Sequence, residues 1–196
     1  MAHLRAALAS EDWPIKLVIS GVGMANATTA AERVIADCAP TAVLNYGCAG
    51  AHRPDLAIGD VVVGTRVVAY LQADAPVVEC DEALVESARR VADDRVKFGT
   101  VASADAWNRD VNAIAELANR HHSLCEDMEA AAIGLVCAAR GVPFLTIKDI
   151  SNNELVQATL SAEHMIGQLG REQIARRAAE FTYTVLRDQA YSMSRR

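Results

Sequence analysis

Short apolar runs alternate with segments of helical spacing along most of the chain. β-Branched apolar runs bounded by glycine or proline favour buried strands, and apolar residues recurring on one helical face favour helices. These patterns predict strands at 15–20, 42–46, 58–70, 96–102 and 143–148, and helices at 28–38, 82–92, 111–120, 129–140 and about 161–191. Pro40 is expected to stop the first helix, and Gly141 to cap the helix over 129–140.

This alternation predicts an α/β fold, a three-layer α/β/α sandwich around a mixed, mostly parallel sheet. In such folds, ligands bind at the carboxyl ends of the strands. The 196 residues are 52% hydrophobic, which is enough for one substantial core. We therefore predict a single domain over 1–196, with an atypical N-terminal segment at 1–14 and a frayed tail at 192–196.

Charge and hydropathy point to a small-molecule ligand. The net charge is −6, and no run of five basic residues occurs, which argues against nucleic acid or an anionic membrane as the main partner. The first residues lack a signal-length apolar region, and no apolar stretch approaches the roughly eighteen residues of a membrane span. We expect a cytoplasmic protein.

The cysteines and histidines do not form a recognisable metal or disulfide pattern. Five cysteines without a C-x-x-C pair signal neither a disulfide framework nor a zinc site, so we expect reduced and mostly buried thiols. His121 and His122 are neighbours whose side chains point in different directions, and surface or loop positions suit them better than metal ligation. We predict no metal and no cofactor.

Residues 125–153 form the most informative segment. They are expected to contain an acidic helix start, a helix, a turn, a buried strand and a polar strand end, a layout that can hold a ribose and a purine. Glu129 falls in the predicted first turn, where the positive helix end favours a carboxylate that could accept hydrogen bonds from two ribose hydroxyls. Alternatively, Glu126, Asp127 and Glu129 merely cap the helix.

Two glycine turns follow predicted strands. Gly21-Val-Gly23 could begin a dinucleotide fingerprint, but Asn26 stands where G-x-G-x-x-G needs its third glycine. The alternative is a tight turn where the backbone passes close to another element. In Gly47-Cys-Ala-Gly50, small residues would let backbone amides approach a ligand, and a nucleophilic cysteine is disfavoured because no base is paired with it.

Five motifs occur in an order that resembles nucleosidases of the purine nucleoside phosphorylase superfamily, with the greatest similarity to 5′-methylthioadenosine/S-adenosylhomocysteine nucleosidases. The resemblance covers the chain from about residue 15 to the end. The order of five motifs is far more specific than any one of them. The motifs are Gly47-Cys-Ala-Gly50, Ala57-Ile-Gly-Asp-Val-Val-Val63, Ser103-Ala-Asp-Ala-Trp107, Asp127-Met-Glu-Ala130 and Ile150-Ser-Asn152.

The resemblance implies a nucleoside phosphorylase-like fold and a purine nucleoside as ligand. It implies that Met128 packs on the sugar and that Glu129 binds the ribose hydroxyls. It also implies that Cys48, Ala49 and Gly50 form the turn beside the sugar or the attacking water.

At the base end, the resemblance implies that Trp107 stacks on the purine, although a core or interface tryptophan is equally compatible with the sequence. Ser151 and Asn152 would meet the leaving base. Methylthioadenosine nucleosidases usually carry aspartate at position 152, which can protonate purine N7, whereas asparagine only donates and accepts hydrogen bonds. Inosine-, guanosine- and futalosine-like substrates therefore join the adenine nucleosides as alternatives. Asp149 could supply a proton, but strand alternation points it away from Asn152.

The N-terminus departs from the resemblance, which implies a first strand followed by an acidic residue that activates water. Glu11 and Asp12 precede the strand predicted at 15–20, so neither receives that role. Losing a general base costs about a hundredfold to ten-thousandfold in rate. Three explanations remain open: a start downstream of the true one, a short form with altered chemistry, or nucleoside binding with little turnover.

Hydrolysis of an N-glycosidic bond is the predicted reaction. Phosphorolysis is the alternative reaction, but it needs converging cations, and the nearest arginine to Gly47-Cys-Ala-Gly50 is Arg53. A missing first strand would leave a sheet edge or apolar groove uncovered. On that ground, and by resemblance, we predict a homo-oligomer, most simply a dimer.

Overall fold

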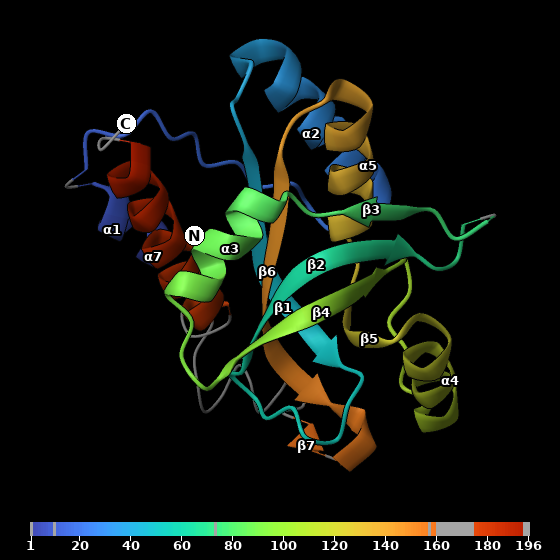
Figure 1. Cartoon of the computed structure of the whole chain (residues 1–196). Helices are drawn as coiled ribbons and strands as arrows, with labels where there is room; N and C mark the ends of the chain where they lie inside the picture. Colours follow the sequence, from blue (N-terminus) through green and yellow to red (C-terminus); the bar gives the residue numbers. More distant parts are fainter. Residues whose placement is uncertain (1, 10, 73, 157, 160–174, 194–196) are drawn as a thin grey trace.

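One mixed sheet runs through the centre of the computed structural model (Figure 1), which describes residues 2–9, 11–72, 74–156, 158–159 and 175–193. The strands are β1 (Val43–Ala51), β2 (Val61–Ala69), β3 (Val77–Glu79), β4 (Val96–Ser103), β5 (Ser123–Asp127), β6 (Phe144–Asn153) and β7 (Ala158–Thr159). The helices are α1 (Ala2–Leu8), α2 (Met24–Cys38), α3 (Glu82–Arg90), α4 (Val111–His121), α5 (Ala130–Arg140), α7 (Arg176–Met193) and the 3₁₀ turn η1 (Glu154–Val156).

The sheet has the strand order β3-β2-β4-β5-β1-β6-β7, and β2 also pairs with β6. The pairs β1/β6, β2/β4 and β4/β5 are parallel, whereas β1/β5, β2/β3, β2/β6 and β6/β7 are antiparallel. Because β2 meets both β4 and β6, five strands close on themselves around the core. Mixed strand pairing with interleaved helices confirms the predicted α/β class.

Helices cover the sheet from two sides (Figure 1). On one side, α2 and α5 pack on each other, and α5 contacts β2, β3, β4 and β6. On the other, α7 packs against α1, α3, β1 and β6. The strands between these helices are buried on both faces. In β2, for example, seven of the nine residues are buried. Burial on both faces explains why near-continuous apolar runs identified most strands.

The strand predicted at 15–20 is wrong, because residues 11–20 form neither helix nor strand. Ile15, Val18, Ile19 and Val22 are exposed by 36–75%. A β-branched run becomes a strand only where a neighbour pairs with its backbone groups, and this segment pairs with no strand in the described part of the chain. Composition alone could not supply that information.

The patterns missed β5, whose residues had been assigned to a helix start. Glu126 and Asp127 lie in this strand rather than in a helix, because β5 pairs with both β4 and β1. The strand is short and ends in two acidic residues, so it carries little β-type signal. The short elements β3, α1 and β7 were also not predicted.

Helix ends largely follow the expected residues. α5 ends at Gly141, whose φ of +65° is the left-handed conformation of a C-terminal cap, as predicted. α2 starts four residues before the predicted Thr28 and ends at Cys38 before Pro40. Helix α7 confirms the C-terminal part of the predicted 161–191 helices and extends into the predicted tail, while 160–174 and 194–196 lie outside the described residues.

Within the described residues, no helix has the length and apolar character needed to cross a membrane. No group of three or more potential metal-ligating side chains gathers there either. Three of the five cysteines, Cys80, Cys125 and Cys137, are buried free thiols.

Candidate functional site

The predicted site residues on β1 and β6 lie side by side. β1 runs between β5 and β6, so that Gly50 faces Glu126 on one side and Asn152 on the other. A register shift after Ala49 leaves Ser151 as the extra residue of β6. The structure thus brings the turn at 48–50 next to Ser151 and Asn152.

Glu129 is the N-cap residue of α5 and not part of its first turn. Its side chain does not cap the helix. Instead, Oε1 of Glu129 accepts a hydrogen bond from the backbone N–H of Gly23, at 2.9 Å. Asp127 performs the capping, because its Oδ2 accepts from the N–H of Ala130 at 2.9 Å. The capping alternative therefore holds for Asp127 but not for Glu129, whose carboxylate is directed towards the start of α2.

The Gly21-Val-Gly23 turn brings the start of α2 to this site. Gly23 has φ +90°, and a Cβ there would lie 2.8 Å from Oδ1 of Asp105. The same Oδ1 accepts from the N–H of Met24 at 2.5 Å. The tight-turn interpretation is thus correct, since only glycine permits both this conformation and this approach. The sequence offered the glycines but not their partners.

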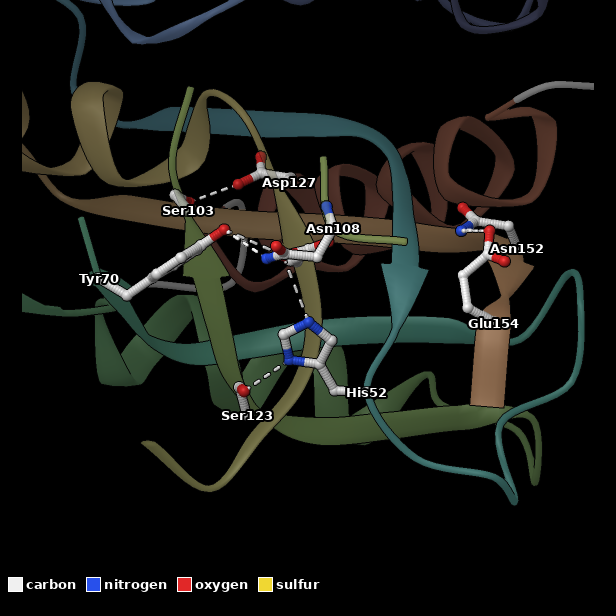
Figure 2. Close-up of polar contacts among 9 residues, drawn as sticks. His52, Tyr70, Ser103, Asn108, Ser123, Asp127, Asn152 and Glu154 are labelled. Carbon is white, nitrogen blue, oxygen red and sulfur yellow. Dashed lines mark hydrogen bonds and ion pairs between the residues drawn. The ribbon is translucent and has the colours of Figure 1, made fainter. Parts of the chain in front are cut away.

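A buried ion pair lies beneath the ribose-binding candidates and was not anticipated. Nζ of Lys148 lies 2.7 Å from Oδ2 of Asp127, and both side chains are at most 2% exposed. Ser103 donates a hydrogen bond to the other oxygen of Asp127 (Figure 2). Burial opposes the charge on Lys148, but the carboxylates of Asp127 and Glu129 outweigh it and raise the pKa of the amine above its usual value. A lysine directly after the mostly apolar run 143–147 of a predicted buried strand was the available signal.

At the other end, the amide of Asn152 is held by its neighbours. Oδ1 of Asn152 lies 3.1 Å from Oγ of Ser151, which is also 3.2 Å from the carbonyl oxygen of Ala49. Nδ2 donates to Oε1 of Glu154 at 3.3 Å (Figure 2). A Cβ at position 50 would lie 3.2 Å from Nδ2, so the amide rests directly over Gly50. Glu154, the first residue of η1, was missed by the sequence reasoning.

Two further groups are placed in ways that limit their chemistry. Oδ2 of Asp149 accepts from the N–H of Ala178 in α7, so the carboxylate of Asp149 points towards α7. Burial raises the pKa of its carboxyl to about 6. Cys48 is exposed, but desolvation by the surrounding protein raises the pKa of its thiol, which argues against a nucleophilic role.

Trp107 is 52% exposed, so it is not a core tryptophan. The guanidinium of Arg109 lies 5.2 Å from its ring centroid. The next residue, Asn108, donates from its backbone and side-chain nitrogens to the two oxygens of Glu126, at 3.0 and 3.1 Å. Asn108 also donates to the hydroxyl of Tyr70 (Figure 2). These bonds tie the loop that carries Trp107 to β5.

Behind this loop lies a line of buried polar groups. Nδ1 of His52 is 2.7 Å from Oγ of Ser123, and Nε2 is 3.5 Å from Oε2 of Glu126. Burial raises the pKa of Glu126, but the nearby His52 ring and the hydrogen bonds from Asn108 outweigh it and lower that pKa below its ordinary value. Ser123 is only 2% exposed, so this line cannot present a nucleophile to a ligand and instead orders the Trp107 loop.

Comparisons with known proteins identify the family of the chain. The phosphorylase superfamily profile matches residues 9–187. The 5′-methylthioadenosine/S-adenosylhomocysteine nucleosidase of Halalkalibacterium halodurans is 31% identical over 170 residues, 78% of this chain and 73% of the relative. The structure of the Helicobacter pylori enzyme of that name superposes with a TM-score of 0.79 at 20% identity, covering 96% of this chain and 95% of the other. Helicobacter pylori futalosine hydrolase superposes with a TM-score of 0.76 at 24% identity, covering 86% and 77%. The chain therefore belongs to the phosphorylase superfamily, as a purine nucleosidase-like member.

Proposed function

We propose that this protein hydrolyses the N-glycosidic bond of a purine nucleoside, with the ribose at Glu129 and the base between Trp107 and Asn152. The observation that carries the proposal is the orientation of Glu129. Its carboxylate turns away from its own helix and meets the N–H of Gly23, while Asp127 takes over the capping. A carboxylate at the start of a helix that does not cap the helix can accept hydrogen bonds from a ligand instead.

At the ribose end, a carboxylate can accept hydrogen bonds from two neighbouring hydroxyls, and bonds to a charged acceptor are the strong ones. In this proposal, Glu129 accepts from the sugar hydroxyls and Met128 packs on the sugar. Glu129 also acts electrostatically on the buried amine of Lys148 and helps to raise the pKa of that amine. Cys48, Ala49 and Gly50 leave room for the sugar and the attacking water.

At the base end, the bond between C1′ and N9 breaks as water attacks C1′, and its electron pair passes to the purine. The base leaves with a proton, and the water loses one. Groups that stabilise this developing charge accelerate the reaction, because they act more strongly in the transition state than in the ground state. Asn152 can serve by hydrogen bonding at the base, with Ser151 beside it and Trp107 stacking on the ring.

The substrate class is tested by release of free purine from a nucleoside panel. The H. halodurans relative is named for methylthioadenosine and S-adenosylhomocysteine, and a structural neighbour for futalosine. We expect base release from at least one of methylthioadenosine, S-adenosylhomocysteine, adenosine, inosine, guanosine or futalosine, without added phosphate.

The choice of water over phosphate as the attacking group is supported by Arg53. Its guanidinium forms an ion pair with Asp55 at 2.9 Å and is therefore not available to bind a phosphate. Formation of ribose 1-phosphate that requires phosphate would instead establish phosphorolysis. Nucleoside binding with no base release at high protein concentration would favour a binding protein.

We also propose that the protein forms a homo-oligomer, most simply a dimer. Ile19 and Val22 are 75% and 72% exposed in the segment that pairs with no described strand. Apolar side chains gathered at a surface favour association. Size-exclusion chromatography with light scattering should give twice the 21.0 kDa of one chain. Ile19→Asp combined with Val22→Asp should shift the protein towards the monomer, and a monomeric parent protein would contradict the proposal.

A further inference from the structure

The start of α2 is capped by a residue from a distant loop. Its N-cap residue is Gly23, which has no side chain to accept a hydrogen bond from the first N–H groups of the helix. Instead, Oδ1 of Asp105 accepts from the N–H of Met24 at 2.5 Å, although the two residues lie 81 positions apart in the sequence. Asp105 therefore supplies the capping group that the residues before α2 lack.

The same turn also holds the carboxylate of Glu129. The N–H of Gly23 donates to Oε1 of Glu129 at 2.9 Å, and the next N–H along the backbone is the one that Asp105 binds. Two carboxylates thus accept from consecutive N–H groups at the start of a 15-residue helix, where the partial positive charge of the helix favours both. The direction of the Glu129 carboxylate consequently depends on where the Gly23 N–H lies.

Asp105 fixes the position of that N–H group. Gly23 has φ +90°, and a Cβ there would lie 2.8 Å from Oδ1 of Asp105, so the carboxylate rests directly against the turn. A glycine turn is conformationally permissive, and the groups that bind its backbone therefore determine its place. Without Asp105, the N–H of Met24 loses its acceptor and the Gly23 N–H is free to move away from Glu129. A misplacement of about 1 Å can cost about a hundredfold in rate.

We propose that Asp105 is a positioning residue that orients the carboxylate of Glu129 towards the ribose hydroxyls through the Gly23 turn. This inference rests on the proposed function, in which Glu129 binds the ribose. Asp105 contacts the backbone of α2 and acts on the sugar only through Gly23 and Glu129. It also precedes Trp107 by two residues, so one loop stacks on the base and holds the turn that orients the sugar ligand.

Nucleosides that lack one ribose hydroxyl test this proposal. The measured quantity is kcat/KM for the preferred nucleoside divided by kcat/KM for its 3′-deoxy analogue, compared between variants so that the intrinsic reactivity of each substrate cancels. Asp105→Ala removes the acceptor and leaves no buried cavity, because Asp105 is exposed. We expect this variant to lower the wild-type ratio by roughly tenfold or more, towards the ratio of Glu129→Ala. Asp105→Asn keeps an oxygen that accepts from Met24 and should stay within a few-fold of the wild-type ratio.

Asp110→Ala is the matched control, because Asp110 ends the same loop and caps α4 by accepting from the N–H of Asn112 at 2.9 Å. This variant removes a carboxylate from a helix start without affecting the Gly23 turn, and it should retain the wild-type ratio. A purely structural cap at Asp105 would lower the rates of both nucleosides alike. An unchanged ratio in Asp105→Ala would therefore overturn the proposal, and so would an Asp105→Asn ratio as low as that of Asp105→Ala.

Failure of this inference can be distinguished from failure of the proposed function. If the wild type releases no base, the proposed function fails, and the role of Asp105 is then tested by calorimetric binding of adenosine, inosine and their 3′-deoxy analogues. Tighter binding of a ribonucleoside than of its analogue by the wild type, lost in D105A and kept in D105N, supports the assignment. Equal or absent binding of both members of each pair by the wild type, or a preference that D105A retains, refutes it.

Discussion

Replacing Glu129 by alanine is expected to lower kcat/KM for the preferred nucleoside by about a hundredfold to ten-thousandfold. Each hydrogen bond to a charged group contributes about 1.5–3 kcal/mol, and two ribose hydroxyls would lose their acceptor together. Steady-state release of free purine measures the effect. Glu129→Gln should fall between wild type and alanine, because the amide oxygen still accepts a hydrogen bond but carries no charge.

The folding stability of the Glu129 variants should change little, which separates a ligand-binding role from a structural one. Its carboxylate accepts from the N–H of Gly23, while the cap of α5 is supplied by Asp127. Urea unfolding of Glu129→Ala should therefore stay within about 1 kcal/mol of wild type, the range of one ordinary hydrogen bond. Full activity in this variant would show that the ribose site has been placed wrongly.

Replacing Lys148 by methionine is expected to destabilise the protein by about 3–5 kcal/mol. The substitution nearly preserves side-chain volume but leaves the carboxylate of Asp127 buried opposite an apolar group. Since the side chain of Asp127 is 1% exposed, water cannot replace the lost amine. Equilibrium unfolding in urea, followed by far-ultraviolet circular dichroism, measures the loss.

The double variant Lys148→Met with Asp127→Asn provides the matched control for this pair. Removing both charges eliminates the uncompensated carboxylate, while the asparagine oxygen can still accept from the N–H of Ala130 or from Ser103. We expect the double variant to recover most of the stability lost in Lys148→Met. A single-variant cost below about 1 kcal/mol, the value typical of exposed pairs, would contradict the buried ion pair.

The sequence alone was sufficient to predict most of the regular elements. The strands near 42–46, 96–102 and 143–148 were recognisable because strands buried on both faces consist of apolar, β-branched residues. The end of α5 was recognisable because Gly141 adopts a backbone conformation that side chains disfavour. These signals depend on a residue and its near neighbours.

Other elements could not be predicted because they depend on distant partners. The run at 15–20 has the composition of a strand but no described strand beside it, and β5 has an acidic composition but two strand partners. Backbone hydrogen bonds between strands determine whether a segment joins a sheet. Those bonds are not encoded within either segment.

In the site, too, some features could be predicted from the sequence and others depend on distant residues. Its principal candidates, Glu129 and Asn152, were identified from the sequence, because their side-chain chemistry and their motifs were already present. Only the tertiary structure assigned the partners of each: Gly23, 106 residues before Glu129, and Glu154, which the turn after β6 sets beside the Asn152 amide. The sequence by itself determined most of the strand and helix pattern and supplied the candidate groups of the site. The folded chain decided which carboxylate caps a helix, which is buried against a cation and which orients an amide, because those roles depend on distances between residues far apart in sequence.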